Sequence, residues 1–355
     1  MKPPAHKTGM HVHTATISFP FPEAPAPGKL VAVAPGVHWL RMPLPFVLDH
    51  INLWLLEDGD GWTAVDCGYG RSEVMLLWER IFEQLRGRPV TRAIVTHYHP
   101  DHAGLADWLC RRFELTPWMT QSEFLTAHTV YGEAAGYGVQ PLLRLFRRHG
   151  LDQDRLDALA RLGNTYHSGV PSLPPTFQRL LDGDEILIHG RSFRVIVGYG
   201  HAPEHATLYC AELKVLISGD MVLPKITTNV SVWPNDPDGD PLGRFIASLE
   251  RYAELPADTL VLPSHGHVFH GLRTRVDALR RHHAQRLDAL IDACAAPRAA
   301  AELLATLFRR ELDVYQLLFA MGEAIAHLNH LWRRGKLERA LDPAGVYRFT
   351  RRGGG

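Results

Sequence analysis

The strongest constraint in this sequence is the nine-residue run THYHPDHAG at positions 96–104. Three imidazoles and one carboxylate follow a short apolar segment at 93–96, which we expect to form a buried strand. Burying so many imidazoles without partners is unfavourable, and imidazole nitrogen and carboxylate oxygen are preferred ligands of Zn²⁺ and related ions. His97 and His99 can face one ion from an extended loop. Asp101 and His102, which open the next helix, can face a second.

A simpler interpretation makes this run a polar loop in which Asp101 caps a helix N-terminus. That interpretation accounts for the aspartate and for none of the three histidines. The sequence therefore favours a metal site.

Three further motifs follow in order: GHAPEH at 200–205, SGD at 218–220 and PSHG at 263–266. With the first run, they resemble the ordered motifs of metallo-β-lactamase superfamily hydrolases, over roughly residues 30 to 270. The resemblance implies an α/β protein with an αββα sandwich and two divalent metal ions, zinc before iron or manganese. It assigns one ion to His97, His99 and His201 and the other to Asp101, His102 and His265. Asp220 would span both ions.

The same resemblance gives Asp66, in the segment VDCG at 65–68, the role of a carboxylate that orients metal ligands. Asp101 would also accept a hydrogen bond from the attacking hydroxide and carry a proton to the leaving group. The intact His99 excludes the diiron flavoproteins of this fold, which carry an acid there. A mononuclear dioxygenase relative stays open.

Apolar periodicity predicts alternating strands and helices, which is typical of layered α/β proteins. We expect a flexible, proline-rich extension at 1–30, a hydrolase domain at 31–271 and a winged-helix-like module at 272–355. A helical insertion at about 121–170 is expected to lie over the hydrolase scaffold. The predicted strands are 37–42, 51–57, 62–66, 93–96, 185–188, 193–197, 207–210, 215–218 and 260–263, and a helix is predicted at 73–86.

The C-terminal region predicts helices at 275–293, 299–307 and 317–334, then a hairpin of strands at 337–340 and 346–350. Three helices and a hairpin are the order of a winged helix, which can bind nucleic acid. Acidic residues alternate with the basic residues of this region. Nucleic-acid binding therefore stays possible, but the charge balance does not favour it. A homodimer is an equally open arrangement. The basic residues are Arg333, Arg334, Lys336, Arg339, Arg348, Arg351 and Arg352.

A small-molecule substrate is the expected partner, and the bulk composition calls for no other. The formal net charge is zero, so neither nucleic acid nor an anionic membrane is required as a partner. The four cysteines are scattered and predict reduced thiols. With no signal-peptide pattern and no membrane-spanning run, we expect a cytoplasmic protein.

The resulting hypothesis is a binuclear hydrolase in which metal-activated hydroxide attacks a small ester-like bond, a thioester or lactone before a β-lactam. The layout resembles hydroxyacylglutathione-hydrolase-like enzymes, although their glutathione-binding region is not evident. The alternative is an endoribonuclease that cleaves single-stranded RNA with help from the winged helix. His205, Lys225 and Asn229 are further catalytic or substrate-contacting candidates, because they neighbour the expected ligands. His282 and His283 are expected at the surface. Trp118, Tyr131, Tyr137 and Trp233 could line the substrate pocket, although core packing is favoured for them.

Overall fold

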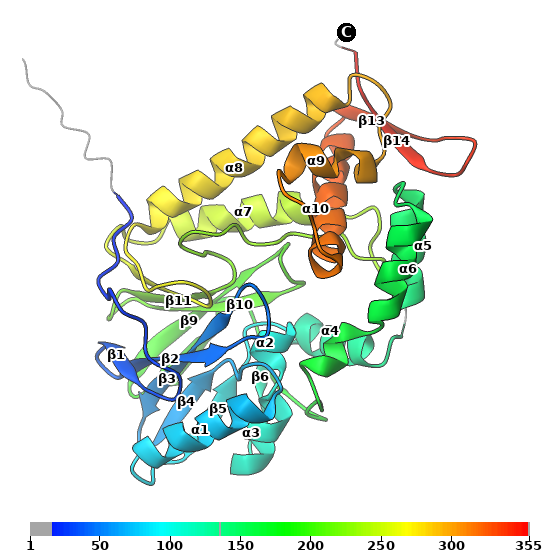
Figure 1. Cartoon of the computed structure of the whole chain (residues 1–355). Helices are drawn as coiled ribbons and strands as arrows, with labels where there is room; N and C mark the ends of the chain where they lie inside the picture. Colours follow the sequence, from blue (N-terminus) through cyan, green and yellow to red (C-terminus); the bar gives the residue numbers. More distant parts are fainter. Residues whose placement is uncertain (1–15, 135, 354–355) are drawn as a thin grey trace, which may run out of the picture.

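The computed structural model describes residues 16–134 and 136–353. Two β-sheets pack face to face between two layers of helices, which is the αββα sandwich that the sequence predicts (Figure 1). The first sheet is antiparallel from β1 to β4 and parallel from β4 to β7. Its strands, in spatial order, are β1 (Val31–Ala34), β2 (Val37–Pro43), β3 (His50–Asp58), β4 (Gly61–Val65), β5 (Val90–Ile94), β6 (Trp118–Thr120) and β7 (Gln178–Leu180).

The second sheet contains five strands, and its last pair, β11 and β12, runs parallel. Between the sheets lies a continuous apolar core, in which Trp39 and Trp54 of the first sheet face Phe193 and Leu208 of the second. This core fixes the spacing of the two sheets and hence of the strand ends that carry the motifs. The strands are β8 (Glu185–Ile188), β9 (Arg191–Gly198), β10 (His205–Cys210), β11 (Val215–Gly219) and β12 (Leu260–Pro263).

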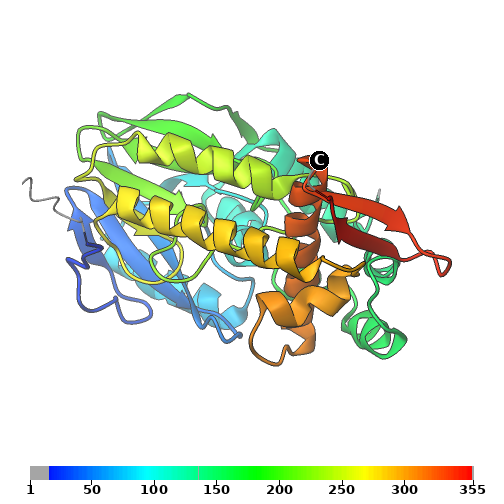
Figure 2. The ribbon, with the colours of Figure 1, turned by 90° about the horizontal axis from the view of Figure 1, so that it is seen from above.

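Helices cover the outer face of each sheet. Helices α1 (Ser72–Gln84) and α3 (Ala106–Phe113) pack on the first sheet, and Trp78 and Ile81 of α1 are fully buried there. On the second sheet, α7 (Pro241–Ala253) and α8 (Leu272–Ala293) run side by side (Figure 2). Helix α7, which the sequence patterns missed, begins where the Asp240 side chain accepts a hydrogen bond from the Gly243 amide.

The helical insertion is present, but most of it does not lie over the hydrolase scaffold as expected. Its helices α5 and α6 share one apolar core with the C-terminal elements, in which Phe146 and Leu156 lie in the same cluster as Leu290, Ile325 and Phe349. Helices α5 and α6 are amphipathic, and they bury their apolar faces against the C-terminal elements instead of against the sheets. The insertion contains α4 (Gln121–Tyr131), α5 (Val139–Arg148), α6 (Gln153–Leu162) and η1 (Thr165–Ser168).

The C-terminal elements occur in the predicted order, three helical segments and then a hairpin. They are α8, the short pair η2 (Ala300–Leu303) and α9 (Leu304–Leu307), α10 (Val314–Arg333), β13 (Leu337–Leu341) and β14 (Tyr347–Arg351). His283, which was expected at the surface, is buried, because its ring faces His327 of α10. We refer to residues 272–353 as the C-terminal module.

The expected flexible extension is wrong for residues 16–30. Ser18 pairs through its backbone with His270, and Phe21 packs against the core between the sheets. Residues 1–15, the rest of that extension, lie outside the described residues. Within the described ranges, no helix combines the length and the apolarity that crossing a membrane requires.

Candidate metal centre

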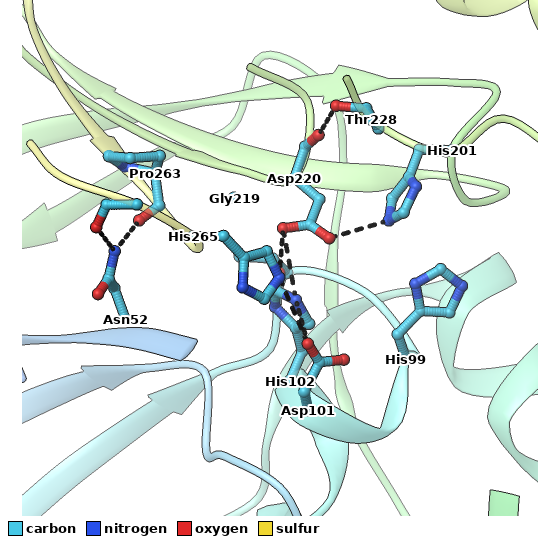
Figure 3. Close-up of polar contacts among 12 residues, drawn as sticks. Asn52, His99, Asp101, His102, His201, Gly219, Asp220, Thr228, Pro263 and His265 are labelled. Atoms are coloured by element: carbon cyan, nitrogen blue, oxygen red, sulfur yellow. Dashed lines mark hydrogen bonds and ion pairs between the residues drawn. The ribbon is translucent and has the colours of Figure 1, made fainter. Parts of the chain in front are cut away.

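The four sequence motifs meet at one edge of the sandwich, beyond the ends of their strands (Figure 3). The first motif follows β5 and runs into the short helix α2 (Pro100–Ala103). His201 lies in the turn between β9 and β10, Asp220 directly follows β11, and His265 follows β12. Because β11 and β12 are parallel, their carboxyl ends, and with them Asp220 and His265, arrive at the same edge.

All seven residues predicted as metal ligands come together there. Their ligand atoms form three groups, each of which could hold a metal ion. Within each group, the ligand atoms lie within 4.8 Å of one another. Asp220 lies between the two sides of the cluster. Its Oδ2 is 3.3 Å from His201 Nε2, and its Oδ1 is 3.4 Å from His265 Nε2. The groups are His97, His99 and His201; His97, His102 and Asp220; and Asp101, His102 and His265.

The donor atoms fit a bound divalent metal. His102 Nε2 and Asp220 Oδ1 are buried without a hydrogen-bond partner, and they lie 3.7 Å apart. Leaving such groups unsatisfied is unfavourable, and a cation between them would satisfy both. Imidazole nitrogens with carboxylate oxygens form the donor set that Zn²⁺ and other first-row metals prefer.

Hydrogen bonds on the far side of the rings turn their Nε2 atoms toward the cluster. His102 Nδ1 lies 2.7 Å from Asp66 Oδ2, which places Asp66 where the sequence predicted an orienting carboxylate. Asp66 is held in turn by the amide and hydroxyl of Thr96. His265 Nδ1 donates to the His50 carbonyl over 2.8 Å, and His201 Nδ1 donates to the Asn229 carbonyl over 2.7 Å.

Burial and mutual repulsion set the protonation states of the cluster. Burial, with repulsion from His201, lowers the pKa of His99 to about 3. Burial alone would raise the pKa of Asp101, but His102 and His265 outweigh it and lower that pKa to about 2. Neutral imidazole at His99 and ionised carboxylate at Asp101 are the states in which these groups bind metals. Burial alone would lower the pKa of His102 and of His265, but neighbouring carboxylates outweigh it and raise both pKa values, so these two rings would release a proton when a metal binds.

Glu123 of α4 is a buried residue that the sequence patterns did not identify. One carboxylate oxygen accepts from the Tyr98 amide over 2.9 Å and the other from the Glu204 amide over 2.6 Å. Burial raises the pKa of Glu123 to about 8. Glu123 therefore ties the first motif to the second, and no local pattern around it signals this contact.

Two of the predicted substrate-contacting residues take other positions. His205 is fully buried behind Asp220, where its Nε2 accepts from the Asp220 amide over 3.1 Å and its ring stacks on His97. The Asn229 side chain turns away to Glu323 of α10. In these positions, neither His205 nor the Asn229 side chain can contact a substrate at the cluster directly.

Lys225 is exposed, and its ammonium lies 5.7 Å from the centre of the Phe19 ring. A role for Lys225 in substrate binding stays a prediction.

A pocket of about 360 Å³ opens beside His201. It lies between α4, the turn 199–203 and the loop that leads into α7, and most of its wall is apolar or aromatic. Tyr137 and Trp233, which were expected in core packing, line this pocket. The other lining residues include Tyr98, Ser122, Leu125, Thr126, Tyr199, Ala202, Ser231, Val232 and Arg244.

A two-sheet sandwich with a histidine–aspartate cluster at its edge defines the class of metal-dependent hydrolases to which the first motif pointed. The family model of the metallo-β-lactamase superfamily matches residues 47–265, and a metallo-β-lactamase-like C-terminal domain model matches residues 287–352. The chain belongs to the metallo-β-lactamase superfamily and carries the C-terminal domain of that group.

Two solved structures resemble the whole chain. A β-lactamase domain protein from Burkholderia ambifaria is 47% identical with a TM-score of 0.89, over 95% of this chain and 98% of that one. A metallo-β-lactamase family protein from Thermus thermophilus is 30% identical with a TM-score of 0.76, over 90% of this chain and all of that one.

Curated relatives are more distant. A probable metallo-hydrolase of Bacillus subtilis is 22% identical over 82% of this chain and 91% of its own length. An atrochrysone carboxyl ACP thioesterase of Aspergillus fumigatus is 23% identical over 64% of this chain and 55% of its own length.

Proposed function

We propose that this protein is a binuclear hydrolase, with zinc as its metal, that cleaves a small ester-like bond in a thioester or a lactone. The observation that carries the proposal is the convergence of seven imidazole and carboxylate side chains, most of them buried, from four separate motifs. When bound, two divalent ions supply Lewis acidity and lower the pKa of coordinated water toward neutrality.

The chain's own residues would hold and orient these ions. His97, His99 and His201 would bind one ion, Asp101, His102 and His265 would bind the other, and Asp220 would contact both. The Asp101 side chain is 20% exposed, whereas the Asp220 side chain is 11% exposed. Asp101 is therefore the carboxylate better placed to take a proton from the attacking water and pass it to the leaving group.

The pocket beside His201 supports a small ester-like substrate. Its volume lies in the range of small-molecule sites, and its aromatic and aliphatic wall suits an apolar acyl or ring substituent. A substrate whose carbonyl lies at the metals would direct that substituent past His201. The similarity to an ACP thioesterase adds support for a thioester.

The alternative, cleavage of single-stranded RNA, receives less support from the C-terminal module. The basic residues near the hairpin are largely compensated, because Arg339 pairs with Asp238 and Arg348 pairs with Glu302 and Asp342. A phosphate backbone would have to compete with these acids, which weakens the electrostatic attraction that dominates nucleic-acid binding.

Metal analysis of the purified protein, with a panel of substrates, tests the proposal. We expect close to two equivalents of zinc and turnover of thioesters or lactones above that of phosphodiesters and single-stranded RNA. Cleavage of RNA without turnover of any thioester or lactone would favour the alternative. A protein that retained no divalent metal would contradict both.

A further inference from the structure

The loop that supports His201 is itself attached to helix α10 of the C-terminal module. The segment 228–232 starts at Thr228, whose hydroxyl donates to the Asp220 carbonyl over 2.5 Å. It ends at Val232, whose amide donates to the Gly322 carbonyl of α10 over 3.0 Å. The segment therefore links the backbone of a proposed metal ligand to a helix roughly one hundred residues further along the chain.

Asn229 stands near the start of this segment and bonds in two directions. Its carbonyl accepts from His201 Nδ1, and its side-chain amide donates to Glu323 Oε2 of α10 over 3.2 Å. The Asn229 side-chain oxygen accepts from the Ser231 hydroxyl over 2.7 Å, which fixes the amide in this orientation. The carbonyl that orients His201 is thus held from the C-terminal module.

Glu323 is anchored rather than free to move. Its Oε1 pairs with Arg286 of α8, and its side chain is only 10% exposed. A carboxylate this buried requires a compensating charge, and Arg286 supplies it. Arg286 also donates to the Leu307 carbonyl, so the pair is built into the packing of three helical segments, α8, α9 and α10.

The close approach of α10 to the segment depends on a glycine. A β-carbon added at Gly322 would lie 2.7 Å from both Cβ and Oγ of Ser231, which is closer than side-chain carbons come to one another. Any larger residue at 322 would push the helix and the segment apart. The glycine therefore permits the contacts that Val232 and Glu323 make.

We propose that Glu323 is a positioning residue for His201, acting through Asn229, and that the C-terminal module thereby sets the metal affinity on the His201 side of the centre. The inference rests on the proposed metal centre. His201 must present Nε2 in one orientation, and the Asn229 carbonyl defines that orientation by accepting from Nδ1. Loss of a partner that orients a ligating histidine reduces metal affinity by about 10- to 100-fold.

The test measures Zn²⁺ binding to the metal-stripped full chain by competition with a chromophoric chelator, without any substrate. Asn229→Ala keeps the carbonyl and removes both side-chain contacts, and Glu323→Ala removes the anchor. We expect each variant to weaken one Zn²⁺ equivalent about tenfold or more, the same equivalent that His201→Ala weakens. Glu323→Gln keeps an acceptor for the Asn229 amide and should lose less affinity than Glu323→Ala.

Glu302→Gln is the matched control, because Glu302 also pairs with an arginine of the C-terminal module but makes no bond to the segment 228–232. Its Zn²⁺ affinity should stay within about twofold of the wild type, since it lies outside the contacts that orient the ligands. The thermal unfolding midpoint of the metal-free Asn229→Ala chain should stay close to that of this control.

If Asn229→Ala and Glu323→Ala bind Zn²⁺ like the wild type, or if Glu302→Gln loses as much affinity as they do, the positioning role is wrong. Gly322→Ala gives an independent check, since it should weaken the same equivalent by displacing Ser231. A wild-type chain that bound no divalent metal would instead contradict the metal centre, and both proposals with it.

Discussion

On each side of the metal centre, a backbone carbonyl orients one histidine by accepting from its Nδ1. The two carbonyls are held by different parts of the fold. On one side, His265 donates to the His50 carbonyl, which belongs to β3 of the central sandwich. On the other side, His201 donates to the Asn229 carbonyl, which lies in a loop held by the C-terminal module. The first support is part of the core of the fold, and the second depends on a separate set of helices.

The His265 side is further tied together by Asn52. This fully buried side-chain amide donates to the Pro263 carbonyl over 2.8 Å (Figure 3) and to the Gly266 carbonyl over 3.1 Å. The backbone amide of Asn52 donates to the Ser264 carbonyl. The loop that carries His265 is therefore bonded directly to β3. The comparison indicates that Asn52→Ala on the His265 side should reduce stability together with metal binding. On the His201 side, Asn229→Ala leaves the Glu323–Arg286 pair in place and should reduce metal binding with little loss of stability.

The largest effect is expected where the two sides meet. Asp220→Ala removes the only carboxylate that lies against both His201 and His265 among the described residues. We expect loss of metal retention and of turnover. Elemental analysis and a thioesterase assay check this. If the variant kept two metals and full activity, Asp220 would not join the two sides of a metal centre, and the comparison of the two sides would fail.

A smaller effect is expected from Asn52→Ala. The Pro263 carbonyl loses the Asn52 amide and Arg41 Nε loses the Asn52 oxygen, whereas the Gly266 carbonyl still accepts from Arg41. Leaving buried polar groups unsatisfied costs about 1–3 kcal/mol of unfolding free energy. Denaturant unfolding of the metal-free chain measures this loss, with Asn229→Ala as the comparison. Equal unfolding free energies for the two variants would show that the two sides do not differ in this way.

The effect that is smallest near neutral pH concerns acid. Burial lowers the pKa of His149 to about 3, and burial together with its neighbours does the same for His283 and His327. The unfolded chain gives these histidines an ordinary pKa of about 6.5, so below that pH the unfolded state binds more protons than the folded one. The stability of the C-terminal module, and of the insertion packed on it, is therefore complete above about pH 6.5. It decreases as the pH falls from there toward 3, because each of these histidines gains a proton on unfolding.

Hydrogen exchange resolved by segment checks this dependence. Amides of α8 and α10 should lose protection as the pH falls from about 6.5 toward 3. His149→Leu removes one of the three titrating groups and should flatten the dependence. Unchanged protection of α8 and α10 over this pH range would contradict the dependence.

The sequence predicted which seven side chains gather at this edge of the sandwich, because their signal is local and chemical. The run at 96–104 places three imidazoles and an aspartate within six residues, a density that ordinary loops and helix caps do not require. Asp66 was predicted for the same reason, from a short motif after a strand, and it contacts His102 as expected. Most strands were also predicted, because their apolar segments are continuous or alternate.

What supports the ligands could not be predicted, because it depends on contacts between distant segments. Nothing near Asn229 indicates that its amide reaches Glu323, which lies on another element of the chain. The apolar faces of α5 and α6 indicate burial but do not identify the partner surface, which the C-terminal module provides. A tryptophan such as Trp233 is equally common in a core and in the wall of a pocket, so the sequence could not tell which position it takes.

The apolar core shared by the insertion and the C-terminal module has a consequence for synthesis. Phe146 and Phe349 belong to one cluster although about two hundred residues separate them. At a translation rate of about 5–20 residues per second, Phe146 leaves the ribosome roughly 10–40 s before its neighbour. During that interval the apolar faces of α5 and α6 have no native surface to cover them, so a nascent chain needs either transient contacts or a holding chaperone at this point.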